Sequence, residues 1–186
     1  MSPILGIIAS QNYQRITDTG DMFPIGAVTV GSAGASSITF SSIPSTYTHL
    51  QIRAFYTNST GTLNDADWKF NSDSTTTNYV QYHQLRGNGT TASAAAGLNY
   101  YSALSPYGAS TTIFSTAIVD MLDYANTNKY KTFRSLTGHD LNGSGNIFLR
   151  SALWMSTSAI NTISITANSG TFVQYSSFAL YGIKGA

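Results

Sequence analysis

Residues 36–57, SSITFSSIPSTYTHLQIRAFYT, decide the fold class. Ile38 and Phe40 alternate with serine and threonine, and this period of two is typical of a half-buried β-strand. After the turn residue Pro44, a second alternating run places apolar side chains on one face: Leu50, Ile52, Ala54 and Tyr56. The stretch therefore predicts two strands joined by a tight connection around Pro44.

The same pattern recurs along the rest of the chain and predicts an all-β, single-domain β-sandwich, jelly-roll-like, of about eight to eleven short strands. Residues 112–122 form an apolar run, which predicts a strand buried on both faces. Residues 91–97 contain three consecutive alanines, and we expect a loop there. The other expected strands lie at 79–84, 129–137, 147–155, 163–167 and 173–183. Turns are expected at 87–89, 142–145 and 168–170.

The amino-acid composition argues against several classes of function. The chain has 186 residues, enough for one domain, and only 9% of them are charged, with a formal net charge of +1. A neutral chain without a basic stripe is a poor nucleic-acid binder and a poor ligand for anionic membranes. There is no cysteine, which excludes disulfides and thiol catalysis, and no glutamate, which is unusual for a helical protein.

The first 15 residues predict either an edge strand or an N-terminal arm, ahead of a sandwich domain at 16–186. The apolar run is far shorter than the ~20 residues of a membrane span, and it lacks the basic start of a secretory signal. As an arm, it would anchor the protein to a neighbouring subunit or to a larger particle. The anchoring side chains would be Ile4, Leu5, Ile7 and Ile8.

Nothing in the chain predicts an enzyme or a cofactor. His139 and Asp140 are adjacent in an extended segment, so their side chains point to opposite faces and cannot easily pair. Ser144 lies in a glycine turn without the G-x-S-x-G spacing. Asp120 and Asp123 are better explained as strand-end residues than as a glycosidase pair.

Residues 64–73 carry Asn and Asp oxygens at a spacing similar to calcium loops. Lys69 and Phe70 occupy positions where such a loop needs an oxygen ligand and a glycine, and the closing glutamate is absent. Polar turns around a short strand explain the same residues, so we expect no metal site.

A cluster of tyrosines is the feature of the sequence that most favours a binding function. Tyr100, Tyr101 and Tyr107 are clustered with Asn and Ser, and tyrosine faces stack on sugar rings while amides and hydroxyls donate neutral hydrogen bonds. These three residues are our candidates for glycan or receptor binding. The alternative is that they lie at the rim of the sandwich or in a subunit interface.

Four segments resemble a family of small tailed-bacteriophage virion proteins: SSIPSTYTHLQIR (41–53), LDYANTNKYKT (122–132), IFLRSALWM (147–155) and FALYGIKG (178–185). The resemblance covers most of the chain, and its motifs are strands and turns without chemistry. It implies a virion component with no catalytic residues, and it does not say which part of the particle.

The expected function is therefore a non-enzymatic structural protein located in the virion, a homotrimer that contacts other virion proteins of the tail or the major capsid protein. As a tail-fibre or adhesin module, its loops around 87–110 and 138–146 would meet a host surface glycan or protein. The alternative is a capsid decoration protein that clamps major capsid subunits, with residues 1–10 laid on the capsid. A phage polysaccharide depolymerase is the least favoured alternative. Neither nucleic-acid binding nor membrane insertion is expected.

Overall fold

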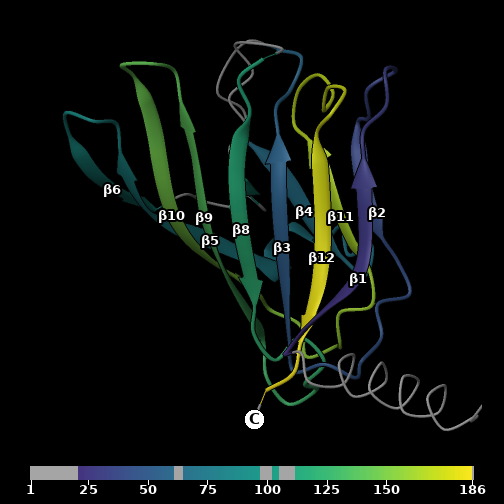
Figure 1. Cartoon of the computed structure of the whole chain (residues 1–186). Coiled ribbons are helices and arrows are strands. Elements are labelled where there is room, and N and C mark those ends of the chain that lie inside the picture. Colours follow the sequence, from purple (N-terminus) through teal and green to yellow (C-terminus); the bar gives the residue numbers. More distant parts are fainter. Residues whose placement is uncertain (1–20, 61–64, 97–101, 105–111, 186) are drawn as a thin grey trace, which may run out of the picture.

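The computed structural model describes residues 21–60, 65–96, 102–104 and 112–185 (Figure 1). Their strands form two antiparallel sheets, which confirms the predicted single-domain β-sandwich. One turn of 3-10 helix, η1 (Thr76–Asn78), is the only helical element among these residues. No helix in the described part of the chain has the length and apolarity to cross a membrane. The proposed arm at residues 1–15 lies outside the described residues.

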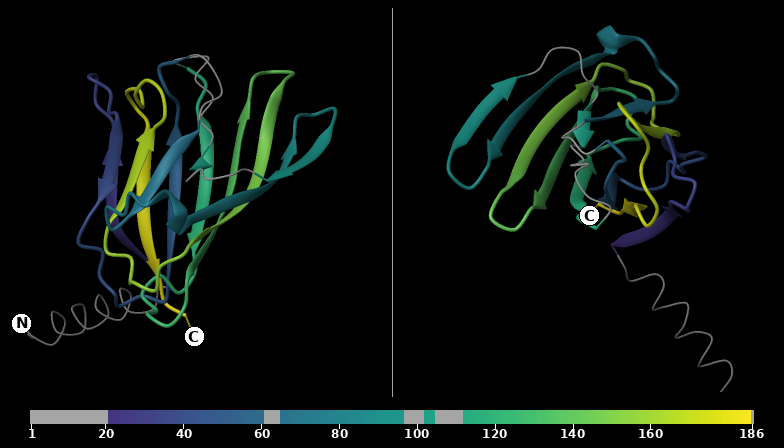
Figure 2. Two further views of the ribbon diagram at one scale, coloured as in Figure 1. Left: turned by 180° about the vertical axis from the view of Figure 1, so that it is seen from behind. Right: turned by 90° about the horizontal axis from the view of Figure 1, so that it is seen from above.

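The two sheets differ in width. The large sheet has eight strands in the order β1 (Met22–Thr29), β12 (Ser177–Ile183), β3 (His49–Tyr56), β8 (Ser115–Met121), β9 (Lys131–Asp140), β10 (Gly145–Trp154), β5 (Tyr79–Gly87) and β6 (Ala92–Ala96). The small sheet has four, in the order β2 (Ser37–Phe40), β11 (Ile163–Ala167), β4 (Ala66–Phe70) and β7 (Ser102–Leu104). At one end, the β9–β10 and β5–β6 hairpins splay away from the rest of the sandwich (Figures 1 and 2).

The core lies between the sheets and is built from the inward faces of alternating strands. In β3, Leu50, Ile52 and Tyr56 are fully buried, as the alternation in the sequence predicts. The small sheet contributes Trp68 and Phe70 from β4, both at 0% exposure. Further fully buried members are Val119, Ile163, Ile165, Phe172, Phe178 and Leu180.

Two sequence predictions about strands need correction. β2 and β3 exist as predicted, but they lie in different sheets, so residues 41–48 cross the sandwich and bury Ile43 instead of making a tight turn. The apolar run at 112–122 is not buried on both faces. In β8, Val119 points inward while Ile118 is 41% exposed, because no described element covers the outer face of the large sheet.

Residues 91–97 also differ from expectation. Residues 92–96 form strand β6, whose alanines pair with β5, although a loop was predicted there. The small side chains gave no alternating pattern to detect. Residues 92–96 form a strand because they pair with β5, and the hairpin turn at 88–91 makes that pairing possible.

An aromatic cluster ties the large sheet to β4 on the side where β10 ends. Phe70 stacks against Tyr79 and packs edge-on to Phe133, with ring centroids 6.2 and 5.4 Å apart. Trp154 donates its indole N–H to Asp73 Oδ2 at 2.9 Å. Burial alone would raise the pKa of Asp73, but hydrogen bonds from Asn78, Trp154 and Thr75 outweigh it and lower the pKa to about 2.

Gly182 in β12 generates our first prediction. A Cβ at this position would lie 2.2 Å from Cδ2 of Tyr47, whose ring stacks on Phe23 at 5.7 Å. Replacement Gly182→Ala must displace the Tyr47 ring, and we expect a loss of about 1–3 kcal/mol in the free energy of unfolding, measured by urea denaturation. The control is Gly31→Ala, where the new methyl group meets nothing within 4 Å. Equal stability of the two variants would contradict this packing.

Candidate recognition site at the hairpin tips

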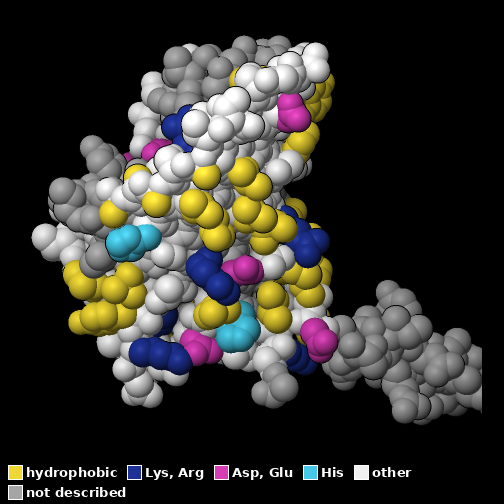
Figure 3. Space-filling model, turned by 90° about the vertical axis from the view of Figure 1, so that its left-hand side faces the viewer, with side chains coloured by type: hydrophobic (Ala, Val, Ile, Leu, Met, Phe, Trp, Pro, Cys, Tyr) yellow, Lys and Arg dark blue, Asp and Glu magenta, His cyan; other side chains and the backbone are white. Residues whose placement is uncertain are grey.

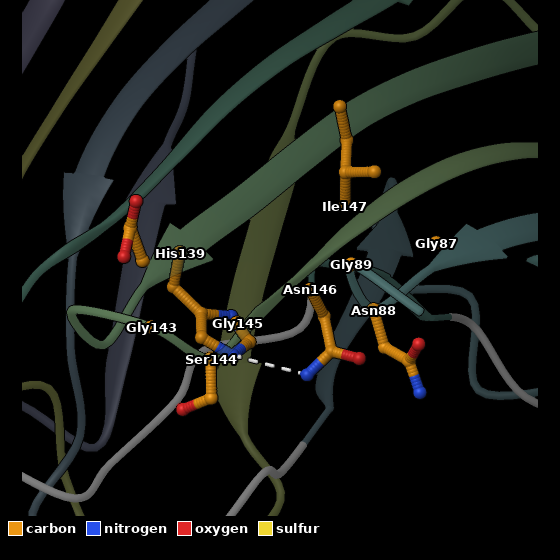
Figure 4. Close-up of a pocket in the computed structure, with 10 residues that line it drawn as sticks. Gly87, Asn88, Gly89, His139, Gly143, Ser144, Gly145, Asn146 and Ile147 are labelled. Carbon is orange, nitrogen blue, oxygen red and sulfur yellow. Dashed lines mark hydrogen bonds between the residues drawn. The ribbon is translucent and has the colours of Figure 1, made fainter. Parts of the chain in front are cut away.

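Two β-hairpin tips lie next to each other at the splayed end of the large sheet (Figure 1). β10 pairs with β9 on one side and with β5 on the other, so Ile147 has Gly138 and Gly87 as its cross-strand neighbours. The β9–β10 turn and the β5–β6 turn therefore meet at the same edge. Between them is a groove of about 390 Å³, lined by residues 87–89, 139–140 and 143–147 (Figure 4).

The β9–β10 turn is fixed by local chemistry. Asn142 and Gly143 both have positive φ, +58° and +102°, and Leu141 N–H donates to Ser144 O at 2.8 Å. An Asn-Gly pair with this geometry is the favoured two-residue hairpin turn, which confirms the turn predicted at 142–145. Asp140 Oδ1 accepts the N–H of Asn142 at 2.8 Å and closes the tip.

The β5–β6 turn is fixed in a similar way. Asn88 Oδ1 accepts the backbone N–H groups of Thr90 and Thr91, at 3.2 and 2.9 Å, and the N–H of Asn88 donates to Thr91 O at 3.2 Å. Gly89 adopts φ +90°, which glycine tolerates without strain. Both walls of the groove are thus held by their own turns, and the site is preorganised.

A short hydrogen-bond chain forms the floor of the groove. Arg86 Nε donates to Asn146 Oδ1 at 2.7 Å, and this contact orients the amide so that Asn146 Nδ2 faces His139 Nε2 at 3.3 Å (Figure 4). Since the amide nitrogen can only donate, this Nε2 must be an acceptor, which assigns a neutral imidazole with its proton on Nδ1.

Electrostatics agree with a neutral His139. Burial lowers the pKa of this imidazole below 6.5 and the positive charge of Arg86 lowers it further, while Asp140 opposes part of the shift. His139 is 8% exposed and faces inward, whereas the Asp140 carboxylate is engaged with the turn. The two side chains therefore have different partners, and neither orients the other for proton transfer.

Arg150 lies on the same face of β10 as Asn146, further from the hairpin tip. It is only 5% exposed, and it donates to Asp65 Oδ1 at 3.1 Å and to Gln84 Oε1 at 3.0 Å. Its guanidinium carbon also lies 4.9 Å from the centre of the Phe148 ring. A buried guanidinium with these partners stabilises the inner surface of the splayed hairpins, so its role is structural.

Alternation along residues 147–155 puts Arg150 on the same strand face as Phe148 and Trp154, but it does not show that this face points inward. The indole of Trp154, which is too large to leave in solvent, was the signal that could have fixed the direction. Arg86 and Asn146 were also missed, because nothing in the sequence places them beside each other.

The remaining sequence candidates lie outside the described residues or have separate partners. Tyr100, Tyr101 and Tyr107 lie outside the described residues, as do Ile4, Leu5, Ile7 and Ile8. In the calcium-like stretch, Asp65 pairs with Arg150 while Asp73 accepts from Trp154. Across the described ranges, no group of three or more metal-type side chains comes together.

His139 generates the second prediction. Its pKa is lower in the folded state than the unfolded value of 6.5, so the unfolded chain binds a proton first and stability falls as pH decreases below about 6.5. Replacement His139→Gln removes this dependence, and urea unfolding of the variant between pH 7.5 and 5.5 should show a flatter profile than the wild type. A profile for His139→Gln as steep as that of the wild type would contradict this prediction.

Comparison with known proteins adds no relative. No protein-family model, no curated protein and no solved structure matches this chain.

Proposed function

We propose that this protein is a non-enzymatic structural module of a tailed-bacteriophage virion, of the tail-fibre or adhesin kind, which contacts a neutral host-surface glycan through the groove at its hairpin tips. The observation that carries the proposal is the groove itself: two rigid turns enclose about 390 Å³ at an exposed end of the sheet. This volume lies in the range of ~300–1,000 Å³ that is typical of small-ligand sites. The virion assignment rests on the sequence resemblance.

The polar groups of the groove favour recognition over catalysis. Asp140 is the one carboxylate among the described residues that line it, and glycoside hydrolysis needs two. His139 is buried, neutral and bonded to Asn146, so it is poorly placed as a general base. These features argue against the depolymerase alternative.

The same groups favour a neutral, hydroxyl-rich ligand. The lining offers the Ser144 hydroxyl, the Asp140 carboxylate and several glycine backbones, and the Arg86 guanidinium beneath it donates to Asn146. Phosphate and sulfate recognition uses cationic donors, whereas sugar hydroxyls pair with acceptors and donors of this kind. In this proposal, Tyr100, Tyr101 and Tyr107 supply stacking faces, and Ile4, Leu5, Ile7 and Ile8 anchor the module to the particle.

A blocking substitution tests the groove. We expect Ser144→Trp to fill the space between the two tips and to weaken host-cell binding by at least about tenfold, which corresponds to ~1.4 kcal/mol. Binding is measured with fluorescently labelled purified protein on host cells. The matched control is Ser158→Trp, at an exposed position beyond the other end of β10, which should bind like the wild type. If both variants bind like the wild type, the groove is not the recognition site.

Capsid decoration is the second candidate, favoured by the exposed apolar outer face described in the next section. The two placements differ in copy number, which quantitative mass spectrometry of purified virions measures against the major capsid protein. A tail module should be present in a few dozen copies or fewer. A number close to that of the capsid protein would assign decoration instead, and absence from the particle would overturn the virion proposal.

A further inference from the structure

The outer face of the large sheet carries a continuous row of aliphatic side chains. Ile118 in β8 lies opposite Leu136 in β9, Leu136 lies opposite Leu149 in β10, and Leu149 lies opposite Leu85 in β5. We call these four residues the outer aliphatic row. Their exposed fractions are 41%, 47%, 50% and 54%, so none is covered by the described parts of the chain.

Two further apolar side chains extend this surface. Phe55 and Ile147 point outward one step along their strands and are 46% and 55% exposed. Together the six side chains, each about half exposed, form an apolar patch on the order of a few hundred Å², the size of the largest and often functional patch on a monomer. Hydrophobic side chains gather accordingly on the face shown in Figure 3. Patches of this size mark interaction surfaces.

A hollow lies beside the row. Its volume is about 510 Å³, and it is bounded by Leu85, Leu149 and Ala94 on the apolar side and by His83 and Arg134 on the polar side. Such a recess accommodates protruding side chains from an opposing surface. A flat row next to a recess provides the shape complementarity that a specific protein interface needs.

Charged residues of both signs flank the row one step along the strands. Asp120 in β8 lies opposite Arg134 in β9, and Gln51 in β3 donates to Asp120 Oδ1 at 2.7 Å. A pairing about a two-fold axis can set Asp120 of one copy against Arg134 of the other. Arg53 in β3 lies opposite Ile118 and adds a second exposed positive charge at the end of the row. The surface thus carries charges of both signs, which a second copy of the same surface can match.

We propose that this outer face, centred on the outer aliphatic row, is the surface through which two copies of the chain pack against each other about a two-fold axis. Such a contact closes as a dimer, in place of the homotrimer expected from the sequence. An apolar centre with a polar flank is the composition found in homodimer interfaces. The packing resembles that of two sheets in a sandwich, with the side chains of opposing faces interdigitated. The inference goes beyond the proposed function and does not depend on the groove.

Sedimentation velocity of the full chain at micromolar concentration tests the proposal. The wild type should sediment as an oligomer, and the double variant Leu136→Lys with Leu149→Lys should sediment as a monomer, with association at least about tenfold weaker. Both residues are half-exposed, so the fold should survive, and circular dichroism with thermal unfolding verifies this. The control Tyr175→Lys, at a side chain 68% exposed outside the row, should remain oligomeric.

Single-cysteine crosslinking gives a second measurement, because the natural chain has no cysteine. The variant Leu149→Cys should form covalent dimers with a short bis-maleimide reagent, whereas Tyr175→Cys should not. This readout detects the contact directly and does not require that a variant lose stability.

Three results would overturn the proposal: a wild-type monomer at micromolar concentration, an oligomer that the Leu136 and Leu149 substitutions leave intact, or an oligomer lost only when Ile4, Leu5, Ile7 and Ile8 are replaced by serine. The last result would assign the contact to the N-terminal segment instead. The groove variant Ser144→Trp should stay oligomeric, so a failure of glycan binding and a failure of self-association are distinguishable.

Discussion

The packing of an eight-stranded sheet against a four-stranded one is the constraint on which the rest of this structure depends. Trp68, Phe70 and their neighbours in the small sheet are buried between the two layers. Phe70 also packs against Phe133 and Trp154, at the ends of β9 and β10 away from the hairpin tip. Four strands spaced about 4.8 Å apart cannot cover eight. The β9–β10 and β5–β6 hairpins therefore extend past the small sheet (Figure 2). The groove and three of the four members of the outer aliphatic row lie on them.

The splayed hairpins show a reversed distribution of polarity. On β9 and β10 the buried inward positions include Ser135, Thr137, His139 and Arg150, while leucines occupy the outward positions. Arg86 and Asn146 give His139 a hydrogen-bonded neighbourhood, and Asp65 pairs with Arg150. The hydroxyls of Ser135 and Thr137 have no hydrogen-bond partner among the described residues. The leucines, which would normally pack in a core, point to solvent instead, and the outer aliphatic row is therefore available for association.

Local features of the fold were predictable because they depend on residues close in the chain. The strands around 38–40, 50–56 and 147–154 follow from alternation, and the turn at 142–145 follows from Asn142 and Gly143. The candidate groove was predictable only in part, as two separate turns near 87–89 and 142–145. Their adjacency depends on β10 lying between β9 and β5, a pairing between segments about 60 residues apart.

The sequence by itself determined that the chain is all-β, where most of its strands and turns lie, and that no cysteine chemistry is present, because alternation, turn residues and composition act locally. Only the tertiary structure decided which face of β8, β9 and β10 points inward. Each of these strands has apolar side chains on both faces, so its orientation depends on which residues the small sheet can reach. The same long-range packing brings Arg86, Asn146 and His139 together and lines up Ile118, Leu136, Leu149 and Leu85, because cross-strand register is fixed by pairing and not by any one segment.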